Sequence, residues 1–151
     1  MTYSKLTWGV KMSFRSYVDA AGGSISVDDG AERAADGTFI FAALPGGDLS
    51  IAADGSASGA MRFQGTVSFE AHGGMLKSTL TQLGVEATEE GLVLTVFDAA
   101  VSQDRCAIAT LDLTQNDGTK ATLAAQITMD GMYQIADNYP PGTELDPVSL
   151  S

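Results

Sequence analysis

Short segments in which apolar and polar residues alternate recur along this chain between turn-forming residues, and this pattern constrains the fold more than any other feature. The clearest case is residues 61–71, where Met, Phe, Gly, Val, Phe and Ala occupy every second position and polar residues the others. Successive side chains of a strand point to opposite faces of the sheet. The segment is therefore predicted to be one long strand with one buried face.

Further strands are predicted at residues 24–27, 38–42, 49–52, 76–80, 92–97, 107–113 and 119–129. Turn signals separate them, such as Asp36-Gly37, Asp54-Gly55 and Asn116-Asp117-Gly118. Residues 130–139 are compatible with a helical turn, and Pro140-Pro141 are expected to end regular structure. With no helical crossover pattern between the strands, the sequence predicts a mainly β fold, a single antiparallel sandwich or barrel-like domain over residues 1–151.

The N-terminal segment departs from this pattern, because its apolar residues recur every three or four positions. From Ser4 to about Ala20 they predict an amphipathic helix, with Ser4 as its N-cap and Gly22-Gly23 as its end. The apolar face of this helix carries Leu6, Val10, Phe14, Tyr17 and Val18.

Charge is distributed unevenly along the chain. The 19 acidic and 8 basic residues give a net charge of −11, which argues against nucleic acid and anionic membranes as partners. Three cations, Lys5, Lys11 and Arg15, nevertheless precede the first acidic residue, Asp19. Two interpretations of these cations are open: they form the solvated face of an ordinary helix, or they form a cationic binding site for an anionic ligand.

Several kinds of site are excluded by residues that the sequence lacks. The single Cys106 excludes an internal disulfide and a multi-cysteine metal site, and its apolar neighbours predict a buried, inert thiol. A lone histidine, His72, has no partners for a zinc site and supports no specific Ser/His/Asp triad. There is no apolar run of transmembrane length and no signal-peptide pattern in residues 1–5, so a cytoplasmic protein and a mature exported domain both fit.

Tyr17 and His72 offer the most specific chemistry. A phenol, with a reference pKa near 10, becomes a good ligand when ferric iron stabilises the phenolate, and tyrosine is an established haem ligand. A histidine hydrogen-bonded to the phenolate stabilises it further. In the strand alternation His72 falls on the polar face with Glu70, unless Gly73-Gly74 re-aim it through a bulge or turn. Spacing alone favours a structural Tyr17 at the edge of the core and a solvated His72.

Three stretches resemble the HtaA domain, the haem-binding module of actinobacterial haem-uptake proteins. Residues 6–18, Leu-Thr-Trp-Gly-Val-Lys-Met-Ser-Phe-Arg-Ser-Tyr-Val, are similar to its opening motif. Residues 65–76 resemble its central strand ending in His-Gly-Gly, and residues 139–148 its terminal motif. The resemblance implies a mostly β fold that binds one ferric haem b. It also implies a non-enzymatic role in haem acquisition, transfer or storage.

Carried over by position, the resemblance makes Tyr17 the axial ligand of the haem iron and His72 the residue that supports it. Ser13, one helical turn before the tyrosine, is expected to touch the haem or a propionate.

Other residues are expected around the haem if this interpretation holds. Lys11 and Arg15 are expected near the propionates, and Phe14 in the pocket wall. The stretch 129–138, where the family tends to supply aromatic residues, holds Met132 and Tyr133 instead, which are expected to pack on the porphyrin.

The family resemblance also implies a location, because HtaA proteins are typically secreted or held at the cell surface. Haem and other haem-carrier proteins are the expected partners, and the sequence does not fix the oligomeric state. Two rival functions remain open. One is a haem-dependent enzyme with peroxidase-like turnover, and the other is the same fold binding a different flat apolar ligand or a protein.

Overall fold

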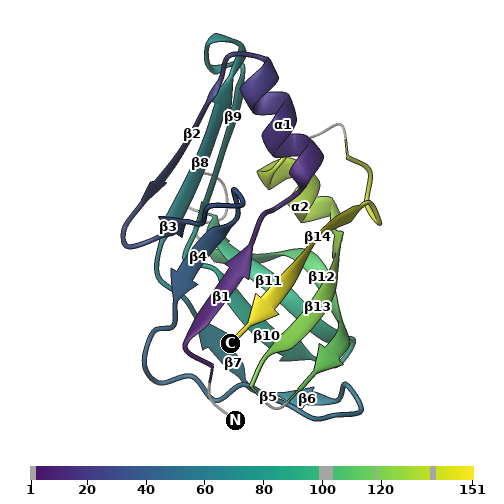
Figure 1. Cartoon of the computed structure of the whole chain (residues 1–151). Coiled ribbons are helices and arrows are strands. Elements are labelled where there is room, and N and C mark those ends of the chain that lie inside the picture. The colour runs from purple at the N-terminus through teal and green to yellow at the C-terminus, as the bar shows by residue number, and fades with distance from the viewer. Residues whose placement is uncertain (1–2, 99–103, 118, 137–138) are drawn as a thin grey trace.

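The computed structural model describes residues 3–98, 104–117, 119–136 and 139–151. Its main element is a large antiparallel sheet that curls into a half-barrel (Figure 1). In the described residues this sheet has nine strands, which are, in spatial order, β3 (Glu32–Arg33), β4 (Phe39–Ala42), β1 (Lys5–Trp8), β14 (Glu144–Leu150), β13 (Ala121–Ile127), β12 (Asp104–Asn116), β11 (Gly91–Asp98), β10 (Gly84–Thr88) and β7 (Ala60–Arg62).

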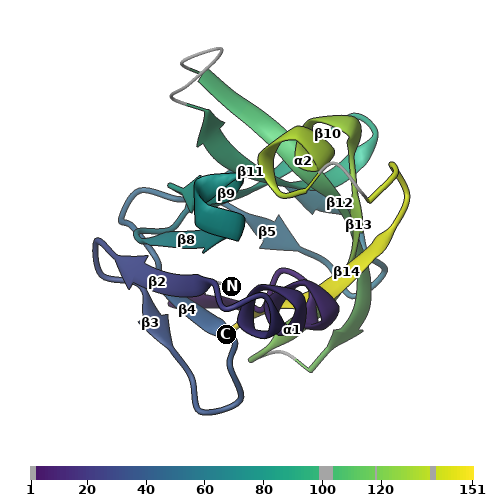
Figure 2. The same cartoon turned by 90° about the horizontal axis from the view of Figure 1, so that it is seen from above.

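A second, three-stranded sheet stands beside the half-barrel and consists of β2 (Ser24–Asp28), β8 (Thr66–Ala71) and β9 (Leu76–Thr81). A small hairpin pairs β5 (Ser50–Ile51) with β6 (Ala57–Ser58). Two helices, α1 (Met12–Ala20) and α2 (Met129–Gln134), lie toward one end of the molecule, with the turn after β8 between them (Figure 2).

The core lies where α1 and the two sheets meet. The Phe69 ring of β8 packs against Phe14 of α1, with centroids 4.9 Å apart, and against Phe39 of β4 at 5.8 Å. All three side chains are at most 1% exposed. The predicted mainly β, antiparallel fold with an N-terminal helix is confirmed, and the predicted strands outside 61–71 overlap β2, β4, β5, β9, β11, β12 and β13.

The predicted helix from Ser4 to Ala20 is wrong in its first half. Residues 5–8 form strand β1, which pairs with β4 and β14, and α1 begins only at Met12. Leu6 and Trp8 are both buried, so the apolar spacing there also satisfies a strand. Ser4 donates its hydroxyl to Ser151 O and does not cap the helix. Met12 N–H at the start of α1 instead donates to Asp146 Oδ1 of β14.

The predicted single strand 61–71 is two strands in different sheets. β7 pairs with β10 in the large sheet, whereas β8 pairs with β2 and β9 in the small one. The corner is at Gly65, whose φ of +127° is accessible to glycine and strained for other residues. Phe63 before the corner and Val67 after it are both fully buried, which explains why the alternation continues across the break.

The end of the chain also differs from prediction, because β14 follows Pro140-Pro141. Pro147 is tolerated within β14 since the register with β13 shifts there, from Leu123 opposite Val148 to Ala125 opposite Leu145.

The short strands β3, β6 and β10 were not predicted, and α2 accounts for the helical turn expected within 130–139. Cys106 is half-buried on β12, where a buried thiol was expected. Gly118 of the predicted turn and residues 137–138 of the ambiguous segment lie outside the described residues. Among the described helices, none has both the length and the apolar content required to cross a membrane.

Candidate functional site

Tyr17 of α1 and His72 meet at the end of the molecule that carries the helices. The Tyr17 phenol oxygen lies 2.5 Å from Nε2 of His72, and the two ring centroids are 5.6 Å apart. Both residues are exposed, Tyr17 to 47% of its surface. The pair is therefore joined by a direct hydrogen bond in a position open to a ligand.

A left-handed turn aims His72 at the helix. His72, Gly73 and Gly74 have φ values of 55°, 66° and 95°, and they connect β8 to β9. Glycine adopts these angles readily, but a histidine there is uncommon and strained, which is a frequent property of functional positions. Of the two orientations left open by the sequence, the structure shows the one in which a turn re-aims His72 away from the strand alternation.

The helix residues near Tyr17 differ in their exposure. Ser13, one turn earlier, is exposed on the surface. Phe14 is 1% exposed and packs against Phe69 and, edge-on at 6.2 Å, against Tyr139. Phe14 thus supports the site from within the core and does not form an open pocket wall.

A surface hollow of about 380 Å³ adjoins the turn that carries His72. It is lined by Met75, Leu76, Lys77, Met132, Tyr133, Ile135 and Ala136. Met75 directly follows Gly74 and is 91% exposed, and Tyr133 on α2 is 71% exposed. The Ser78 hydroxyl donates to Gln134 O at 2.6 Å and ties β9 to α2. Met132 and Tyr133 are thereby placed on the wall opposite the turn.

The three N-terminal cations do not form one binding site beside Tyr17. Lys5 lies on β1 and not on a helix. Arg15 is 8% exposed, and its Nη1 donates to Gly9 O at 2.6 Å and to Asp146 Oδ2 at 2.7 Å. The expectation that Arg15 binds propionates is not met in this arrangement, because its charge is already paired inside the protein.

Lys11 lies near a tyrosine that the sequence analysis did not select. Its Nζ donates to Glu144 O at 2.7 Å and is 5.8 Å from the ring centroid of Tyr139. Tyr139 is half-buried and also touches Phe14. Its place at the start of the stretch 139–148, which resembles the terminal motif of the family, was the available signal.

The described residues offer few groups of side chains that could bind a metal ion. No group of three or more His, Cys, Asp or Glu residues that could enclose an ion occurs among the described residues. The phenol oxygen of Tyr17 with a histidine nitrogen behind it suits a metal that brings most of its own ligands, as iron does in haem.

Comparison with known proteins agrees with the fold. The family model HtaA, described as Htaa, matches residues 3–151. The crystal structure of the C-terminal domain of HtaA from Corynebacterium glutamicum is 24% identical, with a TM-score of 0.76 over 98% of this chain and 95% of that chain. The N-terminal domain of the same protein is 24% identical, with a TM-score of 0.75 over 99% and 97%.

A further similar structure is the haem-binding protein HtaB from Corynebacterium glutamicum, at 19% identity and a TM-score of 0.74 over 98% of this chain and 91% of that chain. A sequence search of curated proteins gave no match. The match to the family model runs from the first described strand to the last. The chain belongs to the HtaA family.

Proposed function

We propose that this domain binds one ferric haem b through the Tyr17 phenolate, with His72 as its hydrogen-bonding support. The observation that carries the proposal is the 2.5 Å contact between the phenol oxygen and Nε2 in an exposed position. An exposed hydrogen bond contributes little to folding, and the left-handed φ of 55° at His72 costs energy. Binding a ligand is a better reason for this arrangement than stability.

Tyr17 and His72 have different roles in binding the haem iron. Ferric haem supplies a hard Lewis acid that favours an anionic oxygen. Tyr17 provides that oxygen once its phenolic proton has left. His72 Nε2, already in contact with the phenol, is placed to accept this proton and then to donate an N–H to the phenolate.

Apolar and cationic contacts are available on either side of the pair. Met75, Met132 and Tyr133 offer exposed or half-buried surface for the porphyrin around the adjoining hollow. Ser13 is exposed one helical turn before Tyr17, and Lys11 is the candidate cation for a propionate. Arg15 serves instead to fix the start of α1 against β14.

Family membership supports a role in haem acquisition, transfer or storage, and one structural neighbour, HtaB, is itself described as a haem-binding protein. Tyrosinate favours ferric over ferrous iron, so reduction is a natural route for release to another haem carrier. A non-enzymatic role is proposed because the sole histidine supports the ligand and is not placed as a separate acid–base group. For the same family reason we propose a secreted or cell-surface location.

Titration of the purified domain with hemin tests the proposal. Wild-type protein should give a saturable Soret band and the visible charge-transfer features of a tyrosinate complex, at one hemin per chain. Tyr17→Phe keeps the ring but removes the ligand, and is expected to weaken binding at least about tenfold and to abolish those features. Tyr3→Phe, the same change at a buried tyrosine outside the proposed site, should retain them. Unchanged affinity and spectrum in Tyr17→Phe would overturn the ligand assignment.

A further inference from the structure

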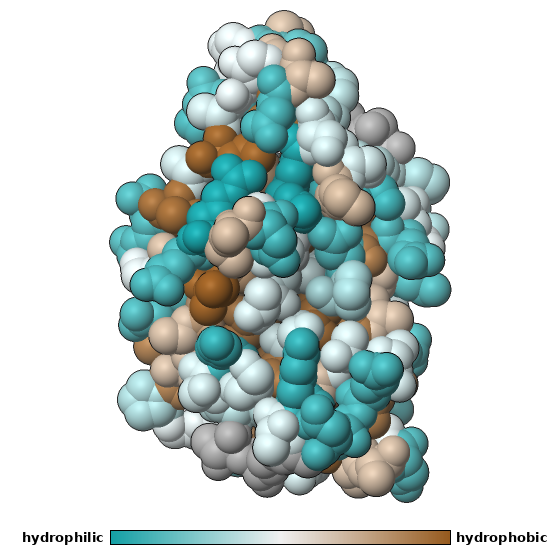
Figure 3. Space-filling view, viewed as in Figure 1, coloured by the Kyte–Doolittle hydropathy of each residue, from teal (hydrophilic) through white to brown (hydrophobic). Residues whose placement is uncertain are grey.

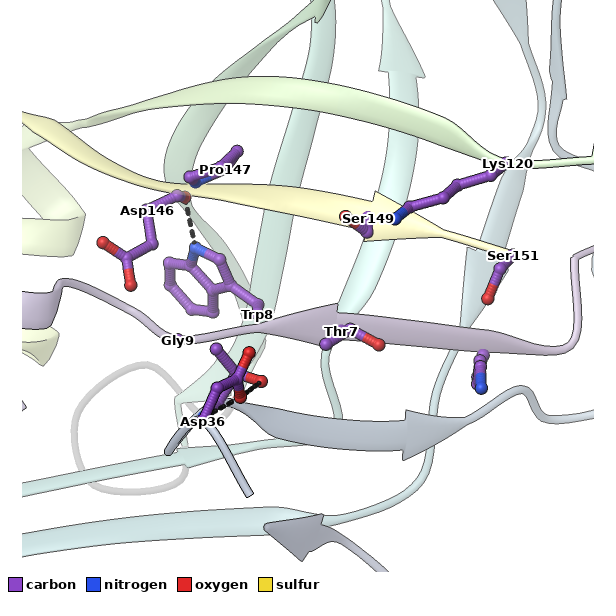
Figure 4. Close-up of a pocket in the computed structure, with 11 residues that line it drawn as sticks. Thr7, Trp8, Gly9, Asp36, Lys120, Asp146, Pro147, Ser149 and Ser151 are labelled. Atoms are coloured by element: carbon purple, nitrogen blue, oxygen red, sulfur yellow. Dashed lines mark hydrogen bonds between the residues drawn. The ribbon is translucent and has the colours of Figure 1, made fainter. Parts of the chain in front are cut away.

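A second pocket lies on the outer face of the large sheet, away from Tyr17 and His72. It has a volume of about 410 Å³ and lies over β1 and β14 (Figure 4). Trp8, Gly9, Asp36 and Asp146 line one end, and Lys5, Lys120, Ser149 and Ser151 the other. The same face is turned to the viewer in Figures 1 and 3, where the surface is mainly polar with apolar side chains scattered over it.

Strand register brings the two lysines to one row. Lys5 and Ser151 are paired through reciprocal backbone hydrogen bonds, each 3.1 Å long. Ala121 lies opposite Leu150, so the preceding Lys120 lies beside Ser151. Lys5 and Lys120 therefore lie on either side of Ser151, at the end of β14.

A second row, of hydroxyl groups, lies next to the lysines. Thr7 is opposite Ser149 on one side of β14, and Thr122 is opposite Ser149 on the other. These three residues are half-buried, while the alternating neighbours Leu6 and Leu150 are fully buried. The hydroxyls therefore belong to the outward face, and the Lys120 side chain extends along it toward Ser149 (Figure 4).

The acidic groups of the pocket are already engaged. Asp36 Oδ1 accepts hydrogen bonds from the backbone N–H and the hydroxyl of Thr38. Asp146 accepts from Arg15 and from Met12 N–H. The two carboxylates are thus bound within the fold and do not reach the lysine end as counter-ions.

Trp8 and Thr38 at the other end donate to Asp146 O and Asp36 Oδ1, whereas the side chains at the lysine end have no such bond in the described part of the chain. Among the described residues the ammonium groups of Lys5 and Lys120 form no ion pair, and the Arg15–Asp146 pair is the one found there. Nor do the side-chain hydroxyls of Thr7 and Ser149 bond to another protein group within that part of the chain. The pKa of Asp117 is lowered first by the backbone N–H of Thr119 and also by the charge of Lys120, but no ion pair joins the described side chains of Lys120 and Asp117. In a protein of net charge −11, two lysines outside any described ion pair, beside two hydroxyls without a described side-chain hydrogen bond, form a local site for an acceptor.

We propose that Lys5, Lys120, Thr7 and Ser149 bind an oxyanion, a carboxylate or phosphate group carried by a small organic molecule. Charge-assisted hydrogen bonds from ammonium and hydroxyl groups suit such an oxygen, which accepts and does not donate. The volume of about 410 Å³ leaves room for an organic body beyond the charged group. At ordinary ionic strength, screening over about 10 Å weakens the repulsion from distant acidic residues, so the groups that line the pocket decide which charge it attracts.

Amide NMR of the full chain, titrated separately with inorganic phosphate and with succinate at constant ionic strength, tests this proposal and distinguishes the two anion classes. Saturable shifts are expected at Thr7, Lys120 and Ser149 with at least one of the two. The double variant Lys5→Gln/Lys120→Gln should weaken binding about tenfold, because it removes both charged donors.

Two controls make the outcome decisive. Lys77→Gln removes a lysine at the other end of the molecule and should bind like the wild type. Lys5→Arg/Lys120→Arg keeps the charges and should retain most of the affinity. Shifts that do not saturate, that sodium chloride reproduces, or that persist unchanged in the double glutamine variant would overturn the proposal.

Discussion

The phenol oxygen of Tyr17 and Nε2 of His72 are 2.5 Å apart although 55 residues separate them in sequence. The contact joins the middle of α1 to the turn between β8 and β9, and the buried Phe14–Phe69 pair joins the same helix to β8 just before that turn. The aromatic contact in the core therefore fixes the distance between helix and turn, and the polar pair sits above it at the surface.

Replacement of His72 is expected to weaken haem binding without abolishing it. His72→Ala leaves the Tyr17 oxygen as a ligand but removes its hydrogen-bond partner, worth about 1.5–3 kcal/mol for a charged acceptor, or about 10–100-fold in affinity. Hemin titration should show this loss together with a shifted charge-transfer band. His72→Gln, which can still donate a hydrogen bond, should fall between alanine and wild type; equal affinity in all three proteins would refute a supporting role.

Replacement of Asp146 is expected to lower the free energy of unfolding. Asp146→Ala removes the partner of Arg15, whose side chain is only 10% exposed, and the acceptor of Met12 N–H at the start of α1. Leaving a largely buried guanidinium without its partner should cost about 3 kcal/mol, measured by urea unfolding. Asp19→Asn, at an exposed carboxylate of the same helix, should change stability by less than about 0.5 kcal/mol. A similar small effect from both variants would contradict a structural role for the ion pair.

Gly131 is expected to tolerate no side chain, because α2 packs closely on β12 at this residue. A Cβ atom there would lie 2.1 Å from Ile108 O and 2.7 Å from Ile127 Cγ1. Gly131→Ala should therefore destabilise the protein by about 1–3 kcal/mol and displace α2 with Tyr133. Thermal unfolding and hemin titration measure the two effects. Met129→Ala, on the exposed side of the same helix, is the comparison, and a Gly131→Ala protein as stable as that variant would show that the packing is not tight.

Three aspartates in exposed turns are expected to make the protein less stable in acid. In Asp36 and Asp54 the hydroxyl two residues later is the main cause of a lowered pKa, followed by the backbone N–H of the same residue. In Asp117 the backbone N–H two residues later comes first. Because each pKa is lower in the folded chain than its usual value of 3.8, the stabilisation is present above that pH.

This contribution is lost as the pH falls from 3.8 through the folded-state values. The urea midpoint of the wild type should therefore be lower at about pH 3 than at about pH 6. In the triple variant Asp36→Asn, Asp54→Asn, Asp117→Asn, the urea midpoint should fall less between these two pH values. An identical decrease in both proteins would assign the acid sensitivity to other groups.

Strand positions could be predicted where the alternation of apolar and polar residues reflects the burial of one strand face. Phe63 and Val67 fit one continuous pattern, yet they belong to different sheets, because a corner at Gly65 preserves the alternation while it changes the pairing partner. Leu6 and Trp8 illustrate the converse error. Their spacing suits a helix and a strand equally, and the pairing of β1 with β4 and β14 selects the strand.

The candidate site was predictable in its members more than in its geometry. Tyr17 and His72 were identified by motif, whereas spacing alone favoured a structural tyrosine and a solvated histidine. Arg15 was expected to face a ligand, because the sequence carries no sign that Asp146, 131 residues away, would pair with it. Tyr139 was missed, since its contacts with Phe14 and Lys11 join distant parts of the chain.

The sequence by itself determined the antiparallel β character, the presence of an N-terminal helix, and the residue types from which a haem site is proposed. These properties follow from local periodicity and from side-chain chemistry, which depend only on neighbouring residues. The tertiary structure alone decided which strands pair, where α1 begins and where each cation points. Those outcomes depend on contacts between residues far apart in the chain, and the left-handed turn at His72 is the clearest case: its direction has meaning only relative to the helix that it meets.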